Sequence, residues 1–413
     1  MRIAVWHNLP SGGGKRALYD HVRGLLEAGH EVEAWAPPSI DRAYLPLETL
    51  IEQHIVPLER PAYRLTDKLQ LTLYMNAFAA AMEAHSRACA EQIAGGGFDI
   101  LLANSCMYFH SAPIGRFVDL PSILYLQEPC RRLSEAMPNP FWAALPSDRA
   151  GAPLQRMKSA FVDARDIRNG RIQLREEVRN ARAYGRILCN SFFSRENILR
   201  AYGVDAEVCY LGIDETQFRP GPEERGDYVV ALGALSPHKN PRLCIEAVAR
   251  MKAPRPRLVW IGNVSDPEYG AEMEALARAG EVELDIRIGI SDEQLFDTLR
   301  HATAMIYAPR LEPFGLAPLE ANACGTPVVA IAEGGIRETI VDGVNGLLAE
   351  AEPAALGAAL QSLFDQPALA RRLGNGGRQL VETQWSHRAS TERLIAKLEA
   401  EIARGRQATA RTA

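Results

Sequence analysis

A strand, a glycine-containing loop, a helix and a second strand follow one another at the start of the chain. Residues 2–6 (RIAVW) are a short apolar run, residues 11–15 interrupt it, and residues 17–26 then have apolar side chains at helical spacing. A second apolar run begins at Val32. Two strands joined through a helix run parallel, and a parallel sheet needs helices on both of its faces. The sequence therefore predicts an α/β protein with a doubly wound parallel sheet.

The same alternation begins again near residue 227 and predicts a second sheet. Apolar runs mark its expected strands, at 227–233, 257–263, 286–290, 303–309 and 326–331. Asn240-Pro241 suits the start of a helix, because Asn caps free N–H groups and Pro is tolerated at the first helical position. The Pro-, Gly- and Glu-rich stretch 220–226 is typical of a linker.

These patterns divide the chain into two domains of similar size and a tail. We predict a first Rossmann-like domain at 1–218, a second at 219–384, and a final helix at 385–413. Helical inserts at 60–94 and 150–186 depart from the strand–helix alternation of the first domain.

Composition limits the classes of function. The 413 residues include 46 Lys and Arg against 51 Asp and Glu, a net charge of −5, which argues against a general nucleic-acid partner. The 7 cysteines are scattered without a CxxC pair, as in reduced cytoplasmic proteins. No run reaches the roughly 18 apolar residues of a membrane span, and the N-terminus does not have the pattern of a secretory signal. We expect a cytoplasmic protein whose membrane contact, if any, is peripheral.

The second insert is strongly basic. Residues 150–186 hold nine Lys or Arg against four Asp or Glu, including Arg168, Arg171, Arg175, Arg179, Arg182 and Arg186. On a helix that spacing places the arginines along one side. Two interpretations stay open. The side is a solvated face with Glu176 and Glu177 as counterions, or it docks an anionic acceptor or an anionic membrane.

The segment 307–346 carries the densest set of chemical groups, in the sequence YAPRLEPFGLAPLEANACGTPVVAIAEGGIRETIVDGVNG. Pro313 keeps Glu312 out of a regular helix, whereas Glu320 falls about one turn inside the helix predicted to begin at 314–316. The N-terminus of that helix offers N–H groups and partial positive charge to a diphosphate. Ligands bind at this edge of open parallel sheets. Taken alone, the two glutamates also suit a structural capping role.

The string EPFGLAPLE, with ANACGTPVVA and GGIRE after it, resembles the signature of glycosyltransferase family 4. The resemblance extends to GGGKRALYDHVRGLLEAGHEVEAW, ILCNSFFSRENILRAYGV, VCYLGIDETQF and Trp385-Ser386. It implies a GT-B fold, with two Rossmann-like domains facing a central cleft. By this resemblance, 1–218 would be the acceptor side, 219–384 would bind the donor, and the helix at 385–413 would cross back to the first domain. It also implies a retaining, metal-independent hexosyltransferase of polysaccharide biosynthesis, which takes a UDP- or GDP-sugar as donor and needs no further cofactor. The absence of a DxD triplet agrees with metal independence.

The resemblance also implies roles for single residues. Glu320 would accept hydrogen bonds from the ribose hydroxyls, Glu312 would face the donor hexose, and Lys239 would neutralise the diphosphate. Backbone N–H groups are implied to approach the sugar and phosphate at Phe314, Gly315 and Leu316. We expect the same of two glycine-containing loops, at Gly13, Gly14, Gly334 and Gly335. Lys15 contacts phosphate or lies on the solvated surface.

Two positions depart from the family pattern. Ala234 stands where the family commonly has Arg, so one partner for the phosphates is missing from that loop. Arg310 or His238 is the candidate to supply the missing positive charge. Many members carry a His near the reacting centre, where the stretch 125–129 of this chain offers Gln127 and Glu128. His110 is either a nearby substitute or a packed core residue.

The alternatives to a transferase with a glycan, lipid-linked or small-molecule acceptor are therefore three. They are a sugar-nucleotide epimerase, a phosphorylase on the same fold, and a catalytically idle sugar-nucleotide-binding protein.

Overall fold

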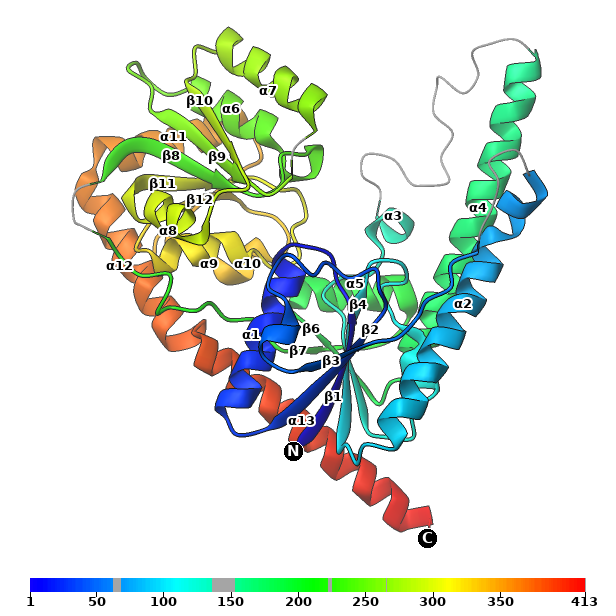
Figure 1. The fold of residues 1–413 in the computed structure, drawn as a ribbon. Helices are drawn as coiled ribbons and strands as arrows, with labels where there is room; N and C mark the ends of the chain where they lie inside the picture. The colour runs from blue at the N-terminus through cyan, green and yellow to red at the C-terminus, as the bar shows by residue number, and fades with distance from the viewer. Residues whose placement is uncertain (62–67, 136–152, 222–224, 265, 413) are drawn as a thin grey trace. The chain divides into compact units, whose positions relative to one another are not determined.

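The computed structural model describes residues 1–61, 68–135, 153–221, 225–264 and 266–412. The chain forms two compact units, the first comprising Met1–Cys209 and Arg393–Ala413 and the second Tyr210–Glu392 (Figure 1). Each unit is built around its own parallel sheet, as the two series of alternating strands and helices predict.

The first unit holds a seven-stranded sheet in the order β3-β2-β1-β4-β5-β6-β7, and all neighbouring strands run parallel. The strands are β1 (Arg2–Asn8), β2 (Glu31–Ala36), β3 (Glu52–Ile55), β4 (Ile100–Cys106), β5 (Ser122–Tyr125), β6 (Arg186–Cys189) and β7 (Glu207–Val208). β4 and β5 are buried along their whole length, as strands covered on both faces must be.

The helices of the first unit include two long inserts that pack against each other. They are α1 (Gly13–Glu27), α2 (Lys68–Ala94), α3 (Arg131–Ser134), α4 (Pro153–Ala181) and α5 (Phe192–Tyr202), with the short 3-10 helices η1 (Leu47–Thr49) and η2 (Pro113–Arg116). α2 and α4 correspond to the inserts expected at 60–94 and 150–186, although residues 62–67 and 136–152 lie outside the described part. Glu83 on α2 joins them, because its Oε1 lies 3.4 Å from Nη1 of Arg179 on α4.

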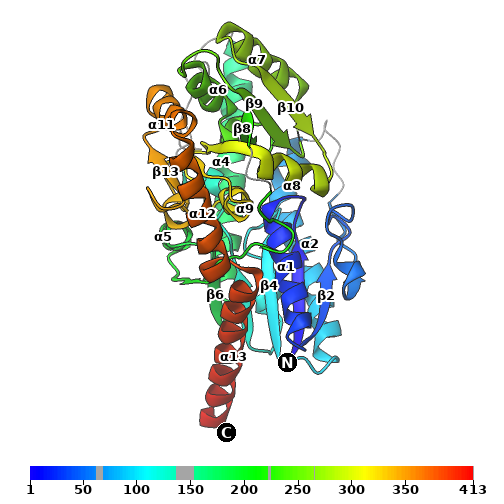
Figure 2. The same cartoon turned by 90° about the vertical axis from the view of Figure 1, so that its left-hand side faces the viewer.

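The second unit holds a six-stranded parallel sheet in the order β10-β9-β8-β11-β12-β13. Its strands are β8 (Gly226–Leu232), β9 (Arg257–Gly262), β10 (Leu284–Ile288), β11 (Ala302–Tyr307), β12 (Val328–Ile331) and β13 (Gly346–Ala349). Its helices are η4 (Pro237–Lys239), α6 (Pro241–Ala249), α7 (Pro267–Ala279), α8 (Asp292–His301), α9 (Leu316–Ala323), α10 (Ile336–Thr339), α11 (Pro353–Asp365) and α12 (Pro367–Gln384). Figure 2 shows α12 beside α9 and α11, which it contacts.

The two compact units meet along the chain at 209/210, whereas the sequence predicts a boundary at 218/219. Contacts within the second unit explain the difference. Ile213 forms a bridge with Ser386, and Nη1 of Arg378 on α12 donates to the carbonyls of Glu215 and Phe218, at 3.0 and 2.9 Å. The segment 210–218 is therefore held by the C-terminal helices of that unit.

The last helix, α13 (His387–Thr412), begins in the second unit and passes into the first at Arg393. There Nζ of Lys397 lies 2.8 Å from Oε2 of Glu207, and Oε2 of Glu401 lies 3.3 Å from Nε of Arg186. These ion pairs attach the tail to β6 and to the edge strand β7.

The basic side of α4 is shorter than the sequence predicts. Arg186 lies in β6, where it pairs with Glu207 and Glu401, so it does not belong to the helix face. Glu177 is no counterion of that face either, because its side chain is fully buried on the opposite side. Glu176 does act as one, with Oε1 2.8 Å from Nη2 of Arg175 and Oε2 3.7 Å from Nη1 of Arg179.

Candidate functional site

The candidate site of the second unit lies at the carboxyl ends of three neighbouring strands. β8, β11 and β12 are adjacent in the sheet, and the segments that follow them carry Lys239, Glu312 and Gly334-Gly335. From β8 the chain proceeds to β9 and β10 on one side of the sheet, and it then crosses to β11 on the other side of β8. The carboxyl ends of β8 and β11 therefore form a topological switch point. Open α/β sheets bind ligands at such points.

Lys239 and Glu312 form an ion pair across the switch point. Nζ of Lys239 lies 3.1 Å from Oε1 and 2.9 Å from Oε2 of Glu312, and the two side chains are 28% and 15% exposed. Asn240, next to Lys239, fixes the loop by donating from Nδ2 to the carbonyl of Ala308 at 3.2 Å. The resemblance assigns Glu312 to the donor hexose and Lys239 to the diphosphate, and the structure brings these two side chains together. Both charged groups stay partly exposed to solvent.

Tyr307, the last residue of β11, lies beside both glutamates. Burial, and then the charges of Glu312 and Glu320 together with a hydrogen bond to Glu312, raise the pKa of Tyr307 well above its ordinary value. A neutral phenol there can donate to Glu312 and hold its carboxylate in place. The sequence analysis missed Tyr307, whose only signal is its position at the end of a strand directly before the motif.

Gly334 and Gly335 pack directly against the loop that carries Glu312. A Cβ on Gly334, which has φ +58°, would lie 2.5 Å from the carbonyl oxygen of Glu312, and one on Gly335 would overlap the carbonyl of Pro313. The N–H of Gly335 donates to the carbonyl of Glu312 at 2.8 Å. That N–H is therefore occupied within the protein, which corrects its expected role toward phosphate. The contact expected of Gly334 stays a prediction.

Glu320 lies within α9, which begins at Leu316 as the sequence predicts. Gly315 precedes it with φ +96°, a conformation that favours glycine. Phe314 is buried, with its ring centroid 6.1 Å from that of Tyr210 and 5.6 Å from that of Trp385. Its side chain thus anchors the loop from within, which leaves the backbone at 314–316 for the expected donor contacts. Glu320 is only 5% exposed.

The two candidates to compensate for Ala234 are differently placed. Nε of Arg310 lies 2.7 Å from Oε2 of Glu333, and its side chain is 53% exposed. His238 is exposed in η4. Either side chain would have to turn toward the Lys239–Glu312 pair, and Arg310 would have to leave Glu333.

In the first unit the glycine-containing segment and the segment after β5 lie side by side. Gly13 and Gly14 form the first turn of α1, after Gly12 at φ +138°, so they are a helix N-terminus rather than a bare loop. Nε2 of Gln127 donates to the carbonyl of Gly14 at 3.3 Å. Oε2 of the neighbouring Glu128 lies 3.9 Å from Nε of Arg131. The structure therefore brings the predicted residues of this unit together at the carboxyl ends of β1 and β5.

Lys15 is neither solvated nor directed at a ligand. It is 1% exposed, and its Nζ donates to the carbonyl of Asp41. Burial lowers the pKa of Lys15, although the charges of Asp41 and Glu48 oppose that shift. Lys15 in turn acts on buried His7, whose pKa is lowered to about 3 by burial and then by the charge of Lys15. Both alternatives expected for Lys15 are thus wrong, because α1 turns its side chain inward.

His110, whose side chain is 27% exposed, takes part in a polar cluster with the buried residues Cys130 and Glu177. The possible ligand atoms of these three residues lie within 4.8 Å of one another. Burial disfavours the imidazolium, but interactions with Cys130 and Glu177 outweigh it and raise the pKa of His110 to about 10. His110 is therefore more than a packed core residue. Sequence reasoning did not connect it with Cys130 or Glu177.

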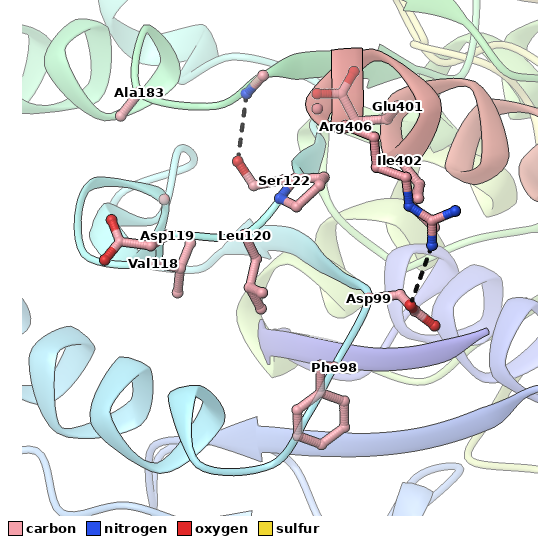
Figure 3. Close-up of a pocket in the computed structure, with 14 residues that line it drawn as sticks. Phe98, Asp99, Val118, Asp119, Leu120, Ser122, Ala183, Glu401, Ile402 and Arg406 are labelled. Atoms are coloured by element: carbon pink, nitrogen blue, oxygen red, sulfur yellow. Dashed lines mark hydrogen bonds and ion pairs between the residues drawn. The ribbon is translucent and has the colours of Figure 1, made fainter. Parts of the chain in front are cut away.

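A pocket of about 500 Å³ occupies the other end of the first unit's sheet (Figure 3). Asp99 and Gly185 directly precede β4 and β6, and Ser122 begins β5, so the pocket lies at the amino ends of the strands. Arg406 on α13 closes one side, with Nη2 3.9 Å from Oδ1 of Asp99. This pocket is remote from every residue of the predicted sites in the first unit.

Two solved structures resemble the fold over nearly all of the chain. Sucrose-phosphate synthase from Thermosynechococcus elongatus has a TM-score of 0.70 at 20% identity, with 97% of this chain and 99% of that one covered. Anabaena HepE in complex with UDP and glucose has a TM-score of 0.70 at 16% identity, with 97% and 100% covered. Together with the two parallel sheets, this likeness confirms that the chain has the GT-B fold.

The sequence of the second unit matches a known family model. Residues 212–380 match the model described as glycosyl transferases group 1. A D-inositol 3-phosphate glycosyltransferase from Frankia alni is 33% identical over 218 residues, 46% of this chain and 53% of the relative. One from Streptomyces coelicolor is 28% identical over 297 residues, 60% of this chain and 64% of the relative. The matches thus span about half to two thirds of those relatives.

Proposed function

We propose that the chain is a retaining glycosyltransferase that moves a hexose from a UDP- or GDP-sugar to a glycan, lipid-linked or small-molecule acceptor. The observation that carries this proposal is the Lys239–Glu312 ion pair at the switch point, inside the segment that matches the family model. The names of the similar proteins support it, since they include glycosyltransferases of inositol phosphate and a protein bound to UDP and glucose.

The charges at this site suit departure of a nucleoside diphosphate. As the bond between the anomeric carbon and the phosphate oxygen breaks, negative charge grows on the diphosphate. Lys239 and the N–H groups at the start of α9 would stabilise that charge without reorganising. The acceptor hydroxyl would attack on the face that the phosphate leaves, and its proton would pass to the departing phosphate oxygen. Such a reaction retains configuration and needs neither a dedicated protein base nor a metal at the diphosphate.

A panel of UDP- and GDP-sugars tests the reaction class. We expect one donor to be consumed, with transfer to an acceptor or slow hydrolysis, and the transferred hexose to keep its anomeric configuration by NMR. Addition of Mg²⁺ or Mn²⁺ should leave the rate unchanged. An epimerised donor or a released sugar phosphate would instead indicate the epimerase or the phosphorylase, and binding without turnover an idle protein. Strict dependence on added Mg²⁺ or Mn²⁺ would contradict charge neutralisation by Lys239.

We also propose that α4 attaches the first unit to anionic membrane. At about 100° per residue, Arg168, Arg171, Arg175 and Arg179 lie within roughly 40° of one direction on the helix. Met157 and Phe161, which are 70% and 48% exposed, fall in the same sector. A helix that presents basic and large apolar side chains on one face suits the membrane interface, with about 1 kcal/mol per basic residue near the surface. Among the described residues, no helix is both long and apolar enough to cross a bilayer.

Liposome sedimentation tests that attachment. We expect salt-sensitive pelleting with vesicles that contain phosphatidylglycerol and little with neutral ones, because screening weakens exposed charges. Arg171/Arg175/Arg179→Glu should abolish the difference. As a control, Arg242→Glu on the exposed side of α6 in the second unit should not. Equal, negligible pelleting with both kinds of vesicle at low salt would leave α4 as a solvated face.

A further inference from the structure

Three side chains with metal-binding atoms converge at the carboxyl ends of β4 and β5. His110 lies in the segment after β4, Cys130 directly precedes α3, and Glu177 lies in the last turns of α4. Cys130 is 8% exposed and Glu177 is fully buried. Nδ1 of His110 lies 3.5 Å from Oε1 of Glu177, and all three ligand atoms lie within 4.8 Å of one another.

We propose that His110, Cys130 and Glu177 bind a zinc ion. Ligands at about 2.0–2.3 Å from a tetrahedral zinc lie roughly 3.3–3.8 Å apart. The distance between His110 and Glu177 already falls in this range, and Sγ of Cys130 lies within 4.8 Å of both ligand atoms. An imidazole nitrogen, a thiolate and a carboxylate are the ligand types of Zn²⁺, whereas Mg²⁺ and Ca²⁺ prefer oxygen alone. Three protein ligands leave a fourth position for water.

The surroundings of the cluster orient its ligands. Nε2 of Gln173, one turn before Glu177, donates to Oε1 of that carboxylate at 2.9 Å, and the hydroxyl of Tyr202 at the end of α5 donates to Oε2. The N–H of Cys130 donates to the same Tyr202 hydroxyl at 3.2 Å. By contrast, Nδ1 of His110 is buried without a hydrogen bond of ordinary geometry to any described residue. The carboxylate is thus held in place by a second layer of donors, as metal ligands are, and an ion would take the place of the proton that the imidazole directs toward Glu177.

A zinc ion bound by this cluster would hold together three segments of the first unit. Cys130 follows Gln127 and Glu128 by three and two residues, so a metal that fixes Cys130 also fixes the end of that segment. The same ion would tie α4 to the loop after β4. These are positioning effects within the first unit, separate from the diphosphate site around Lys239. The proposal stands whether or not the chain transfers sugar.

Metal content tests the site on the whole purified chain. We expect stoichiometric zinc by elemental analysis of protein expressed with Zn²⁺. Cys130→Ser should lose that zinc. Cys89→Ser should keep it, and it is a matched control because Cys89 is also a buried thiol beside an imidazole, with its Sγ 3.5 Å from Nε2 of His85. Tyr202→Phe should weaken zinc binding by about 10–100-fold while the ligands remain.

Cobalt replacement tests the ligands without any substitution. The wild-type chain loaded with Co²⁺ should show a thiolate-to-cobalt charge-transfer band and the intense visible bands of a tetrahedral ion. Competition with a chromophoric chelator then gives the affinity of the wild-type chain and of Tyr202→Phe. Absence of zinc from the wild-type chain, zinc retained by folded Cys130→Ser, or a Co²⁺ spectrum without the thiolate band would each overturn the proposal.

Discussion

Glu320→Ala is expected to weaken nucleotide binding by about 2–4 kcal/mol, because the ribose hydroxyls would lose a charged acceptor worth one or two charge-assisted hydrogen bonds. The carboxylate is 5% exposed, so its bonds to a bound ribose would form largely out of competition with water. The charge of Glu320 also contributes to the raised pKa of Tyr307 at the end of β11. Glu320 therefore lies near the switch point. Titration calorimetry with UDP and with GDP measures the loss.

The control for this variant separates binding from folding. Glu320→Gln keeps the shape of the side chain and should bind nucleotide with an intermediate affinity, while Glu272→Ala on the exposed side of α7 should bind as the wild type does. Thermal melts show whether each variant is folded. Unchanged nucleotide affinity in folded Glu320→Ala would remove Glu320 from the donor site.

Lys239→Ala is expected to lower turnover on the order of 10²-fold, more than Glu320→Gln does. The ribose contacts are alike in the ground state and the transition state, whereas charge on the diphosphate grows only as the sugar bond breaks. Loss of Lys239 also leaves the Glu312 carboxylate without the cation that lies 2.9 Å from it. The carboxylate would then repel the negatively charged diphosphate of a bound donor. Steady-state kcat at saturating donor, for both variants, measures the difference.

Arg310→Ala is the variant to compare with Lys239→Ala, because Arg310 lies in the same loop as Glu312. Arg310 is 53% exposed and paired with Glu333, so its loss should change kcat little. A loss as large as that of Lys239→Ala would instead assign to Arg310 the role left open by Ala234. If Lys239→Ala and Glu320→Gln reduced kcat equally, Lys239 would not act selectively on the transition state.

Much of the fold could be predicted from local sequence pattern. Apolar runs that alternate with helical spacing specify parallel strands covered by helices, and both sheets have that form. Around the motif, Pro313 disfavours helical geometry at Glu312, and Gly315 can adopt the positive φ that precedes α9, which begins at Leu316 as predicted. The resemblance to glycosyltransferase family 4 assigned Lys239 and Glu312 to one donor site, and the structure pairs their side chains at 2.9 Å.

The sequence alone thus determined the features that residues adjacent in sequence set. These are the helices and strands, the parallel class of sheet, and the motif with its backbone turns. Tertiary structure alone decided how side chains far apart in sequence are partnered. It buried Lys15 against Asp41 and used the N–H of Gly335 within the protein. It also brought Glu177 to His110, 67 residues away. Periodicity shows which side of an element is apolar, but strand order and packing decide which polar groups are enclosed there together.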